Sequence, residues 1–573
     1  MTPSAQIAGC FALLLATVTT PAAGTVRYVD PNGSDDGPGS VTQPIRTIGR
    51  AASQAQPGDL VVVNSGTYQE SVILPRSGSA AAPIVFRGLP GAVLTSPDPS
   101  ASLSAFDVGA NADVTIEGFE MTGGFDETVY VRPGAHDVAL SGLHIHGNHT
   151  GIWIAGASYV TVSDSVLDHN FRTGIRIFAG ANHVRVADTL SQANDDGLGC
   201  NGDSDGFNTD ASTSDVTFER ATAAGNSEDG FDLKGPNMAL LQVTAQDNGC
   251  SGVKIAAGGD IENLVSEGNK IGVDINAPAG ATTVLLNGTI ADNDPGVRVI
   301  GSAHTVVVRN SIISGSGKAL DYPASVQLQE DHNILFRPLS KDRLIVCEEA
   351  GGQVLYSGDD VASGKWRRES GQGDGTAYAN PTMHAFDCQL QCGSPAIDTG
   401  SNPGAPPVDR SGTPRPMGTS VDRGAFEWMP IVPALRVRRA VLRADSTSSG
   451  DVQLRAEVDA PSGLAFDPAS DIVSVSLRGM RGDVFRIDVP PTAWKAARLS
   501  DGVLLRLAQR TPAGSAVLTL RWSAGDASLR LHARGADLWV LDGNDLTITV
   551  ELGHIRASTD ATLRTLGHAF CLR

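Results

Sequence analysis

The chain has 573 residues, with 63 Asp and Glu against 43 Lys and Arg, so its formal net charge at pH 7 is −20. This surplus of negative charge argues against nucleic acids and anionic membranes as partners, because both repel an acidic protein. Aromatic residues make up 5% of the chain and glycine supplies 65 residues, a composition that favours short strands and tight turns. The length allows two or three domains.

Residues 1–24 have the pattern of an export signal. An apolar run from Ile7 to Val18 is followed by the small residues of 21–24, as at a signal-peptide cleavage site. No later segment has 18 consecutive apolar residues, so no membrane-spanning helix is expected. We therefore predict a secreted, extracellular or cell-surface protein, and we expect it to be a monomer.

Six cysteines follow the predicted signal. Export brings a chain into an oxidising compartment, where disulfides form. We expect Cys347 to bond to Cys388 or Cys392. Zinc binding by Cys388 and Cys392 is disfavoured, because no second His/Cys pair follows at zinc-finger spacing.

A short pattern, apolar–any–apolar and usually preceded by glycine, recurs through the middle of the chain. Its first residues are 20 to 32 positions apart: Val129, Ile152, Ile175, Phe207, Phe231, Val253, Val273 and Val297. Periods of this size are typical of solenoids, in which each coil buries its apolar face by stacking on its neighbours. Short strands between Gly, Asn and Asp corners, with no helical period, predict an all-β fold, a parallel β-helix.

The middle residue of each pattern should point away from the core, because side chains alternate along a strand. Stacked coils then align these residues in one outward column: Tyr130, Trp153, Arg176, Asn208, Asp232, Lys254, Asp274 and Arg298. All of them except Asp232 and Lys254 are predicted to bind substrate, by offering charge and flat apolar surface. Solvated polar decoration of the strand is the alternative interpretation.

Four acidic residues cluster at one corner of two successive coils. Asp205 and Asp229 immediately precede a glycine, Glu228 precedes Asp229, and Asp232 lies on the outward column. Because Ca²⁺ takes six to eight oxygen ligands, this set predicts a calcium site. Asp before Gly is also an ordinary corner residue. A long loop, 194–204, adds a second possible location at Asp195, Asp196 and Asp203.

Lys254 follows Asp232 in the outward column. A plain Asp232–Lys254 ion pair is one interpretation, and exposed pairs of this kind stabilise little. The other is a general base, because a Lys near a bound cation and partly desolvated has a lowered pKa.

These motifs resemble those of the family-nine polysaccharide lyases, pectate lyase-like proteins with a right-handed parallel β-helix. The similar segments are Asp205-Gly206-Phe207, Glu228-Asp229-Gly230-Phe231-Asp232-Leu233 and Val253-Lys254-Ile255-Ala256-Ala257-Gly258. The resemblance implies Asp205, Glu228, Asp229 and Asp232 as Ca²⁺ ligands and Lys254 as the catalytic base. Two departures stand out. Glu228 replaces an Asp, and Asp210 stands where the family has a Lys.

The C-terminal part changes character. Residues 394–398, 409–410 and 422–427 resemble the closing segment of many bacterial surface β-helix proteins. Alternating stretches such as 452–458 and 546–552 indicate antiparallel strands. We predict a signal peptide at 1–24, a parallel β-helix at 25–330, a closing segment of the solenoid at 331–430, and a smaller antiparallel, sandwich-like β-domain at 431–573.

The resemblance implies a Ca²⁺-dependent polysaccharide lyase that cleaves an acidic, uronate-containing (pectate-like) polysaccharide by β-elimination. Three alternatives remain open. One is a glycoside hydrolase that uses Asp205, Asp229 and Asp232 as acid and base. The others are a non-catalytic carbohydrate-binding protein or surface adhesin, and a C5 epimerase, which shares proton abstraction with the lyase.

Overall fold

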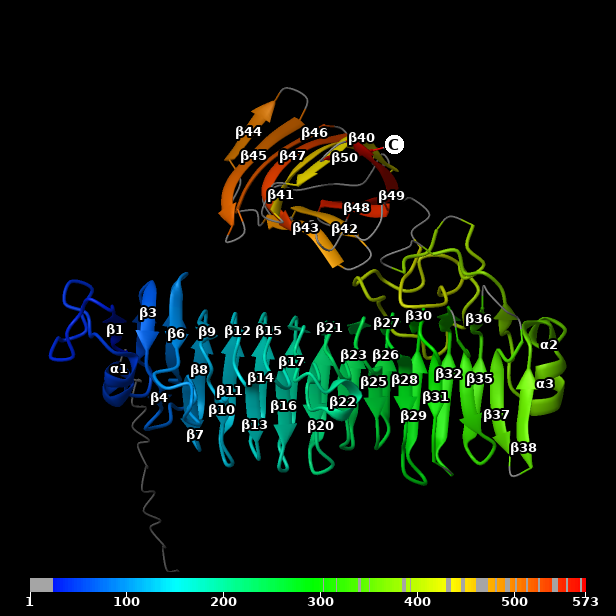
Figure 1. Cartoon of the computed structure of the whole chain (residues 1–573), viewed down its shortest axis with the longest axis horizontal. Helices are drawn as coiled ribbons and strands as arrows, with labels where there is room; N and C mark the ends of the chain where they lie inside the picture. Colours follow the sequence, from blue (N-terminus) through cyan, green and yellow to red (C-terminus); the bar gives the residue numbers. More distant parts are fainter. Residues whose placement is uncertain are drawn as a thin grey trace, which may run out of the picture.

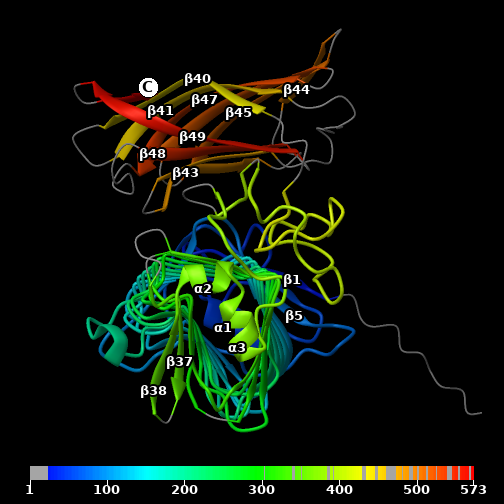
Figure 2. The same cartoon turned by 90° about the vertical axis from the view of Figure 1, so that its right-hand side faces the viewer.

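A computed structural model describes residues 24–428, apart from 302, 316, 338–341, 350, 384–387 and 392, and also the strands found between 434 and 572. The predicted signal peptide therefore lies outside the described residues, except for its last residue. In the described part, three sheets of thirteen short strands wind into one long solenoid (Figures 1 and 2). The predicted parallel β-solenoid is confirmed.

Each coil contributes one strand to each sheet. The first sheet contains β1 (Val26–Val29), β2 (Leu60–Val63), β5 (Ile84–Gly88), β8 (Ala112–Glu117), β11 (His136–Ser141), β14 (Ser158–Ser163), β17 (Asn182–Ala187), β20 (Ser214–Glu219), β23 (Met238–Leu241), β26 (Gly259–Glu262), β29 (Thr282–Leu286), β32 (Thr305–Arg309) and β35 (Gln327–Asp331). The second contains β4 (Val72–Ile73), β7 (Phe106–Gly109), β10 (Glu127–Val131), β13 (Thr150–Ala155), β16 (Ile175–Phe178), β19 (Phe207–Thr209), β22 (Phe231–Leu233), β25 (Ser251–Ile255), β28 (Ile271–Ile275), β31 (Val297–Val299), β34 (Leu320–Pro323), β37 (Ile345–Glu349) and the antiparallel β38 (Gly352–Tyr356).

The third sheet contains β3 (Gly66–Gln69), β6 (Ala92–Thr95), β9 (Glu120–Thr122), β12 (His144–His146), β15 (Val166–Asp168), β18 (Leu190–Gln192), β21 (Thr222–Ala224), β24 (Thr244–Gln246), β27 (Val265–Glu267), β30 (Thr289–Ala291), β33 (Ile312–Ser314), β36 (Ile334–Phe336) and β39 (Ala377–Tyr378). All its neighbouring strands run parallel. Strand order therefore follows coil order in every sheet, and residues about one coil apart in the sequence become direct neighbours.

Apolar side chains fill the inside of the coils, as the repeat predicts. The first residues of the eight repeats stack directly on one another and are fully buried. Phe207 and Phe231 stack with ring centroids 4.9 Å apart, and Phe218 packs against both. Burying an aromatic ring stabilises a core by roughly 3–5 kcal/mol relative to alanine. This aromatic stack supports β19 and β22 from within.

A ladder of buried asparagines fixes one corner of the coils. In each step, a side-chain oxygen accepts a hydrogen bond from the backbone N–H of the asparagine one coil earlier: Asn148, Asn170, Asn194, Asn226, Asn248, Asn269 and Asn293. Buried backbone groups need such partners, because leaving them unpaired costs free energy. The ladder holds the turn that leads into Glu228 and Asp229.

The ends of the solenoid are covered by short helices. Helix α1 (Ile48–Gln54) buries Ile48, Ala51 and Ala52 at one end. Helices α2 (Gly358–Ala362) and α3 (Lys365–Ser370), with the buried Trp366, lie at the other end beside β38 (Figure 1). The motifs of the predicted closing segment lie along the third sheet, where Arg410 donates to Thr244 and Arg423 donates to the carbonyl of Asn333.

The predicted pairing of Cys347 is wrong, because Cys347 carries a buried free thiol. Among the described residues, a disulfide joins Cys200 to Cys250 instead. Cys392 lies outside the described residues. Since Cys347 sits on β37 with its side chain turned into the core, a bond to the later cysteines would need the side chain to leave the coil.

Beyond residue 433 the described strands pair with one another, and each neighbouring pair is antiparallel. They are β40 (Ala434–Ala444), β41 (Ser449–Asp459), β42 (Val473–Gly479), β43 (Gly482–Val489), β44 (Lys495–Leu499), β45 (Gly502–Thr511), β46 (Gly514–Ser523), β47 (Asp526–Asp537), β48 (Asp545–Leu552), β49 (Ile555–Leu566) and β50 (Ala569–Leu572). The division into domains at 330 and 430 stays a prediction. In the described part of the chain, no helix is long and apolar enough to cross a membrane.

Candidate metal and catalytic site

The outward column has the register that the sequence predicts. From β10 to β31, Tyr130, Trp153, Arg176, Asn208, Asp232, Lys254, Asp274 and Arg298 are paired in that order, each with the next. Asp232 and Lys254 therefore share one face of the second sheet. Their roles in binding or catalysis stay predictions, but the geometry on which those predictions depend is present.

Three of the four predicted acids converge. One carboxylate oxygen from each of Asp205, Asp229 and Asp232 lies within 4.8 Å of the others, and the residues are 1%, 2% and 4% exposed. Asp205 accepts hydrogen bonds from the backbone N–H of Asp229 (3.1 Å) and from the Asn208 amide (2.6 Å). Three buried carboxylates this close repel one another unless a positive charge lies among them.

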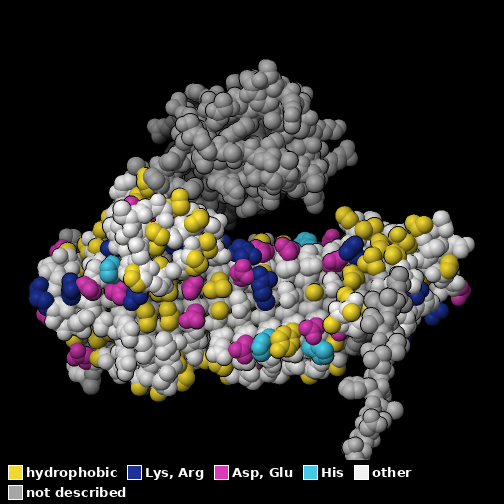
Figure 3. Space-filling view, turned by 180° about the vertical axis from the view of Figure 1, so that it is seen from behind, with side chains coloured by type: hydrophobic (Ala, Val, Ile, Leu, Met, Phe, Trp, Pro, Cys, Tyr) yellow, Lys and Arg dark blue, Asp and Glu magenta, His cyan; other side chains and the backbone are white. Residues whose placement is uncertain are grey.

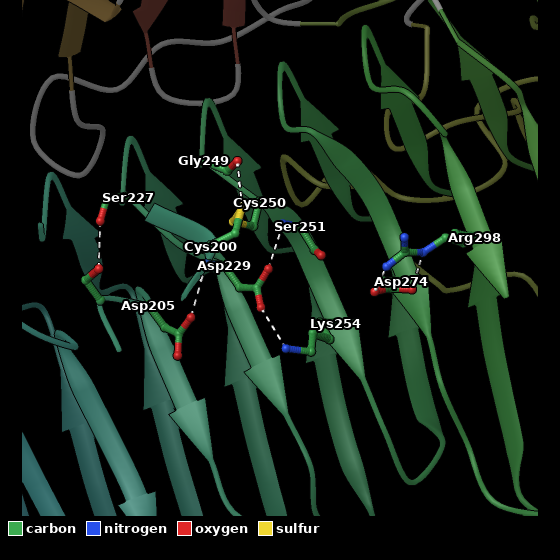
Figure 4. The surroundings of a disulfide bond; sticks show 11 residues. Cys200, Asp205, Ser227, Asp229, Gly249, Cys250, Ser251, Lys254, Asp274 and Arg298 are labelled. Atoms are coloured by element: carbon green, nitrogen blue, oxygen red, sulfur yellow. Dashed lines mark hydrogen bonds and ion pairs between the residues drawn. A yellow bond between two sulfur atoms is a disulfide. The ribbon is translucent and has the colours of Figure 1, made fainter. Parts of the chain in front are cut away.

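Lys254 supplies part of that charge. Its Nζ lies 3.1 Å from Asp229 Oδ2 and 3.5 Å from Asp232 Oδ1 (Figure 4). A second cation, Lys234, pairs with the other oxygen of Asp232. The sequence analysis missed Lys234, which stands one coil after Asp210 in the stacking of β19 on β22. The repeat alignment could have found it, since Asp210 and Lys234 are both three residues beyond the first apolar position.

Asp210 itself has a structural role in this fold. Its carboxylate accepts hydrogen bonds from the backbone N–H groups of Ala179, Ser212 and Thr213. These donors hold the pKa of Asp210 below its usual value, although partial burial opposes the shift. At the position where the family pattern has a Lys, this chain therefore has an Asp that stabilises a turn. The positive charge lies on Lys234, in the neighbouring coil.

Burial and mutual repulsion raise the pKa values of Asp205, Glu228 and Asp229. Burial, followed by the charges of Asp232 and Glu228, raises the pKa of Asp205 well above its usual value. Burial also raises the pKa of Asp229, although Lys254 opposes this. Partial burial lowers the pKa of Lys254, but the Asp229 and Asp232 carboxylates outweigh it and raise the pKa of Lys254 when no cation lies among them.

Glu228 lies beside the converging trio but not in it. Burial and the charge of Asp229 raise its pKa to about 7. Within the described residues, its Oε2 is buried and accepts no hydrogen bond, and the same holds for Asp232 Oδ1. Unsatisfied buried oxygens are costly. Together with the all-oxygen donor set, they fit a hard divalent cation such as Ca²⁺.

The long loop before Asp205 is tied down next to the acids. Cys200, in the short 3-10 turn Gly199–Asn201, is bonded to Cys250, and the neighbouring Ser251 N–H donates to Asp229 over 2.6 Å (Figure 4). The second possible metal location does not form a cluster: Asp196 accepts backbone hydrogen bonds within the loop, and Asp203 pairs with Arg172 and Arg176.

Most other side chains of the predicted substrate-binding column contact neighbouring side chains of the protein. Arg298 forms two hydrogen bonds to Asp274, of 3.0 and 2.6 Å. Trp153 packs edge-on against Phe178, and the Arg176 guanidinium lies 5.2 Å from the Trp153 ring centroid. Tyr130 lies under the guanidinium of Arg132, 4.2 Å from its ring centroid.

Comparison with known proteins defines the class. Residues 27–294 match the family described as Pel9A-like, right handed beta helix region. This stretch, which contains the whole acidic cluster and both lysines, is therefore a Pel9A-like right-handed β-helix. The match confirms the predicted resemblance and the handedness.

Individual relatives cover smaller parts. The chain is 30% identical over 152 residues to the uncharacterized protein YwoF of Bacillus subtilis (strain 168), covering 25% of this chain and 28% of that protein. It is 38% identical over 66 residues to pectate lyase PEL9 of Emericella nidulans, covering 11% and 16%. The chain thus matches less than a third of the length of these curated relatives.

Solved structures of similar shape include pectate lyase Pel9A, with 20% identity and a TM-score of 0.44 over 71% of this chain and 97% of that one. A rhamnogalacturonan lyase matches with 16% identity and a TM-score of 0.32, over 54% of this chain and 82% of that one.

Proposed function

We propose that this protein is a secreted Ca²⁺-dependent polysaccharide lyase that cleaves a uronate-containing, pectate-like polysaccharide by β-elimination. The observation that carries the proposal is the convergence of three buried aspartates beside an outward-facing lysine. The Pel9A-like match over the same residues and the short identity to a pectate lyase support it.

Asp205, Asp229 and Asp232 would hold the cation. Glu228, whose Oε2 accepts no hydrogen bond within the described residues, would complete the set. When bound, Ca²⁺ would draw the charge of these carboxylates away from Lys254 and bind the C6 carboxylate of the substrate, which acidifies the C5 proton.

In the proposed reaction Lys254 removes the proton from C5, and the electron pair forms a C4–C5 double bond as the C4–O glycosidic bond breaks. The leaving oxygen takes a proton from water. Lys254 suits this role by position, since it lies on the open face one coil after Asp232. Its neighbour Lys234 would pair with the acidic substrate, and Asn208 holds Asp205 in place.

The test is incubation of the full mature chain with a panel of polyuronates, with Ca²⁺ or with a chelator. The expected result is Ca²⁺-dependent ultraviolet absorbance from the unsaturated product. No unsaturated product from any polyuronate, together with saturable binding, would instead favour the carbohydrate-binding or adhesin alternative.

A glycoside hydrolase remains the second candidate, because the raised pKa of the buried Asp205 is what a general acid needs. It predicts new reducing ends that form without Ca²⁺ and without an unsaturated product. We also propose export of the chain, which the Cys200–Cys250 disulfide supports, and a separate antiparallel β-domain formed by β40–β50.

A further inference from the structure

A second group of metal-ligating side chains lies on a different sheet from the acids. Glu120 on β9 and His144 and His146 on β12 each offer one ligand atom, and these atoms lie within 4.8 Å of one another. His144 and His146 are two residues apart on one strand, so both point outward from the third sheet. The face drawn in Figure 3 also carries histidines beside acidic side chains.

The contacts within this cluster bring donors of the right kind together. His146 Nε2 lies 3.2 Å from Glu120 Oε1, and the two histidine ring centroids are 4.4 Å apart. Two ligand atoms that each lie 2.0–2.1 Å from a tetrahedral zinc ion are about 3.3 Å apart. The His146–Glu120 spacing therefore already has the value that a shared ion requires.

A further carboxylate orients the cluster from the next coil. Asp168 on β15 lies 2.8 Å from His144 Nε2 through Oδ1, and its other oxygen lies 2.6 Å from His169 Nδ1. A carboxylate on one ring nitrogen fixes the imidazole and makes its other nitrogen a better metal ligand. Because Asp168 occupies Nε2 of His144, Nδ1 is the nitrogen of this ring that is left to coordinate an ion.

The ligand side chains are accessible from solution. The side chains of His144, His146 and Glu120 are 49%, 30% and 41% exposed. An ion can therefore reach them without any rearrangement of the coil.

We propose that Glu120, His144 and His146 form a binding site for a borderline divalent transition metal, with Zn²⁺ as the representative ion. Two imidazole nitrogens and one carboxylate oxygen suit Zn²⁺ and disfavour Ca²⁺, which takes oxygen ligands only. Three protein ligands leave a fourth position for water. The ion joins β9 to β12, and through Asp168 it also braces β15.

Calorimetric titration of the metal-free mature chain with Zn²⁺ tests the site. Wild type is expected to bind one Zn²⁺ that is lost or weakened at least about 10-fold in His144→Ala and His146→Ala. Asp168→Asn is expected to weaken it by about 10-fold to 100-fold. These outward side chains are not part of the core, and circular dichroism of each variant checks that the solenoid is intact.

Two control variants separate this site from other causes. His136 is half exposed and lies 2.7 Å from Asp137, but it belongs to no such cluster in the described part of the chain. His136→Ala should bind Zn²⁺ like wild type, and so should Asp232→Asn. No saturable Zn²⁺ binding by wild type overturns the proposal, as do unchanged affinity in both histidine variants or loss of the same Zn²⁺ only in Asp232→Asn.

Discussion

Asp232 and Asp274 occupy the same outward column two coils apart, and both are buried, yet their surroundings differ. Asp274 meets one guanidinium that donates to both of its oxygens. Asp232 belongs to three carboxylates that share Lys234 and Lys254, with one oxygen that accepts no hydrogen bond within the described residues.

The difference separates a structural ion pair from a binding site. In the pair of Asp274 and Arg298, one negative charge faces one positive charge in a bidentate geometry, so no additional ion is needed for neutrality. In the acidic cluster, three aspartates and the nearby Glu228 exceed the two lysines by two charges, if all four acids are ionised. A divalent cation would remove that excess.

The largest expected effect is on turnover. Lys254→Ala should lower kcat about 10²-fold or more, because β-elimination loses its base, while Ca²⁺ affinity stays near that of wild type. Lys254→Arg should restore little, since a guanidinium stays protonated. The measurement is the rate of unsaturated product formation on the best polyuronate of the panel.

Lys318→Ala is a matched control, because Lys318 forms an ion pair with Asp321 in a later coil. It should leave turnover unchanged. Near-normal activity of Lys254→Ala would show that the base is wrongly assigned, and the same measurement on Lys234→Ala tells whether Lys234 has that role.

The next effect is on Ca²⁺ affinity. Asp229→Asn and Asp232→Asn should each weaken Ca²⁺ binding about 10-fold or more, because affinity follows the number of charged oxygen ligands. Asp274→Asn, in the same column, should leave it unchanged. Calorimetry on the three variants checks this, and a wild-type chain that binds no Ca²⁺ rules out the metal site.

A smaller effect concerns stability without metal. Asp274→Asn should cost about 1–2 kcal/mol, because it removes the opposite charge and one of the two acceptor oxygens that face Arg298. The side chain of Arg298 is 38% exposed, so water recovers part of the loss. Asp232→Asn should cost less, since it also relieves repulsion from Asp205 and Asp229. Urea unfolding in chelator measures both variants, and an equal or reversed order contradicts the comparison.

The register of the column could be predicted because one repeat determines it. A one-residue shift in the register of a strand would turn its apolar residues outward. The buried positions of Phe231 and Val253 therefore determine where Asp232 and Lys254 point. The convergence of Asp205, Asp229 and Asp232 followed from the same stacking. Glu228 was predicted from its place beside Asp229 and from the family resemblance, and the structure puts it at the edge of the cluster.

Contacts from outside the repeat could not be predicted in this way. Cys200 lies in an inserted loop, and its partner Cys250 is 50 residues later; no period links the two. Export predicts disulfides but not their partners, and Cys347 is a free thiol inside a coil. The pKa of Lys254 depends on how many carboxylates face it, which only the structure gives.

Glu330 is a third kind of buried carboxyl group, because mainly neutral donors hold it. Its Oε1 accepts hydrogen bonds of 2.6 Å from Asn333 and Thr376, and burial raises its pKa to about 7. The folded chain therefore keeps a proton here that the unfolded chain releases near pH 4.5.

The contribution of protonated Glu330 to the free energy of unfolding is therefore fully present below about pH 4.5. It is lost as the pH rises through about 7. Inside that window the loss should approach about 1 kcal/mol per pH unit. Glu330→Gln cannot titrate, so its unfolding free energy should fall less steeply than that of wild type between pH 5 and 6.5. Parallel urea unfolding curves at several pH values give both slopes. Equal slopes would mean that Glu330 is ionised in the folded chain and that the charge of the nearby Arg423 offsets the effect of burial on its pKa.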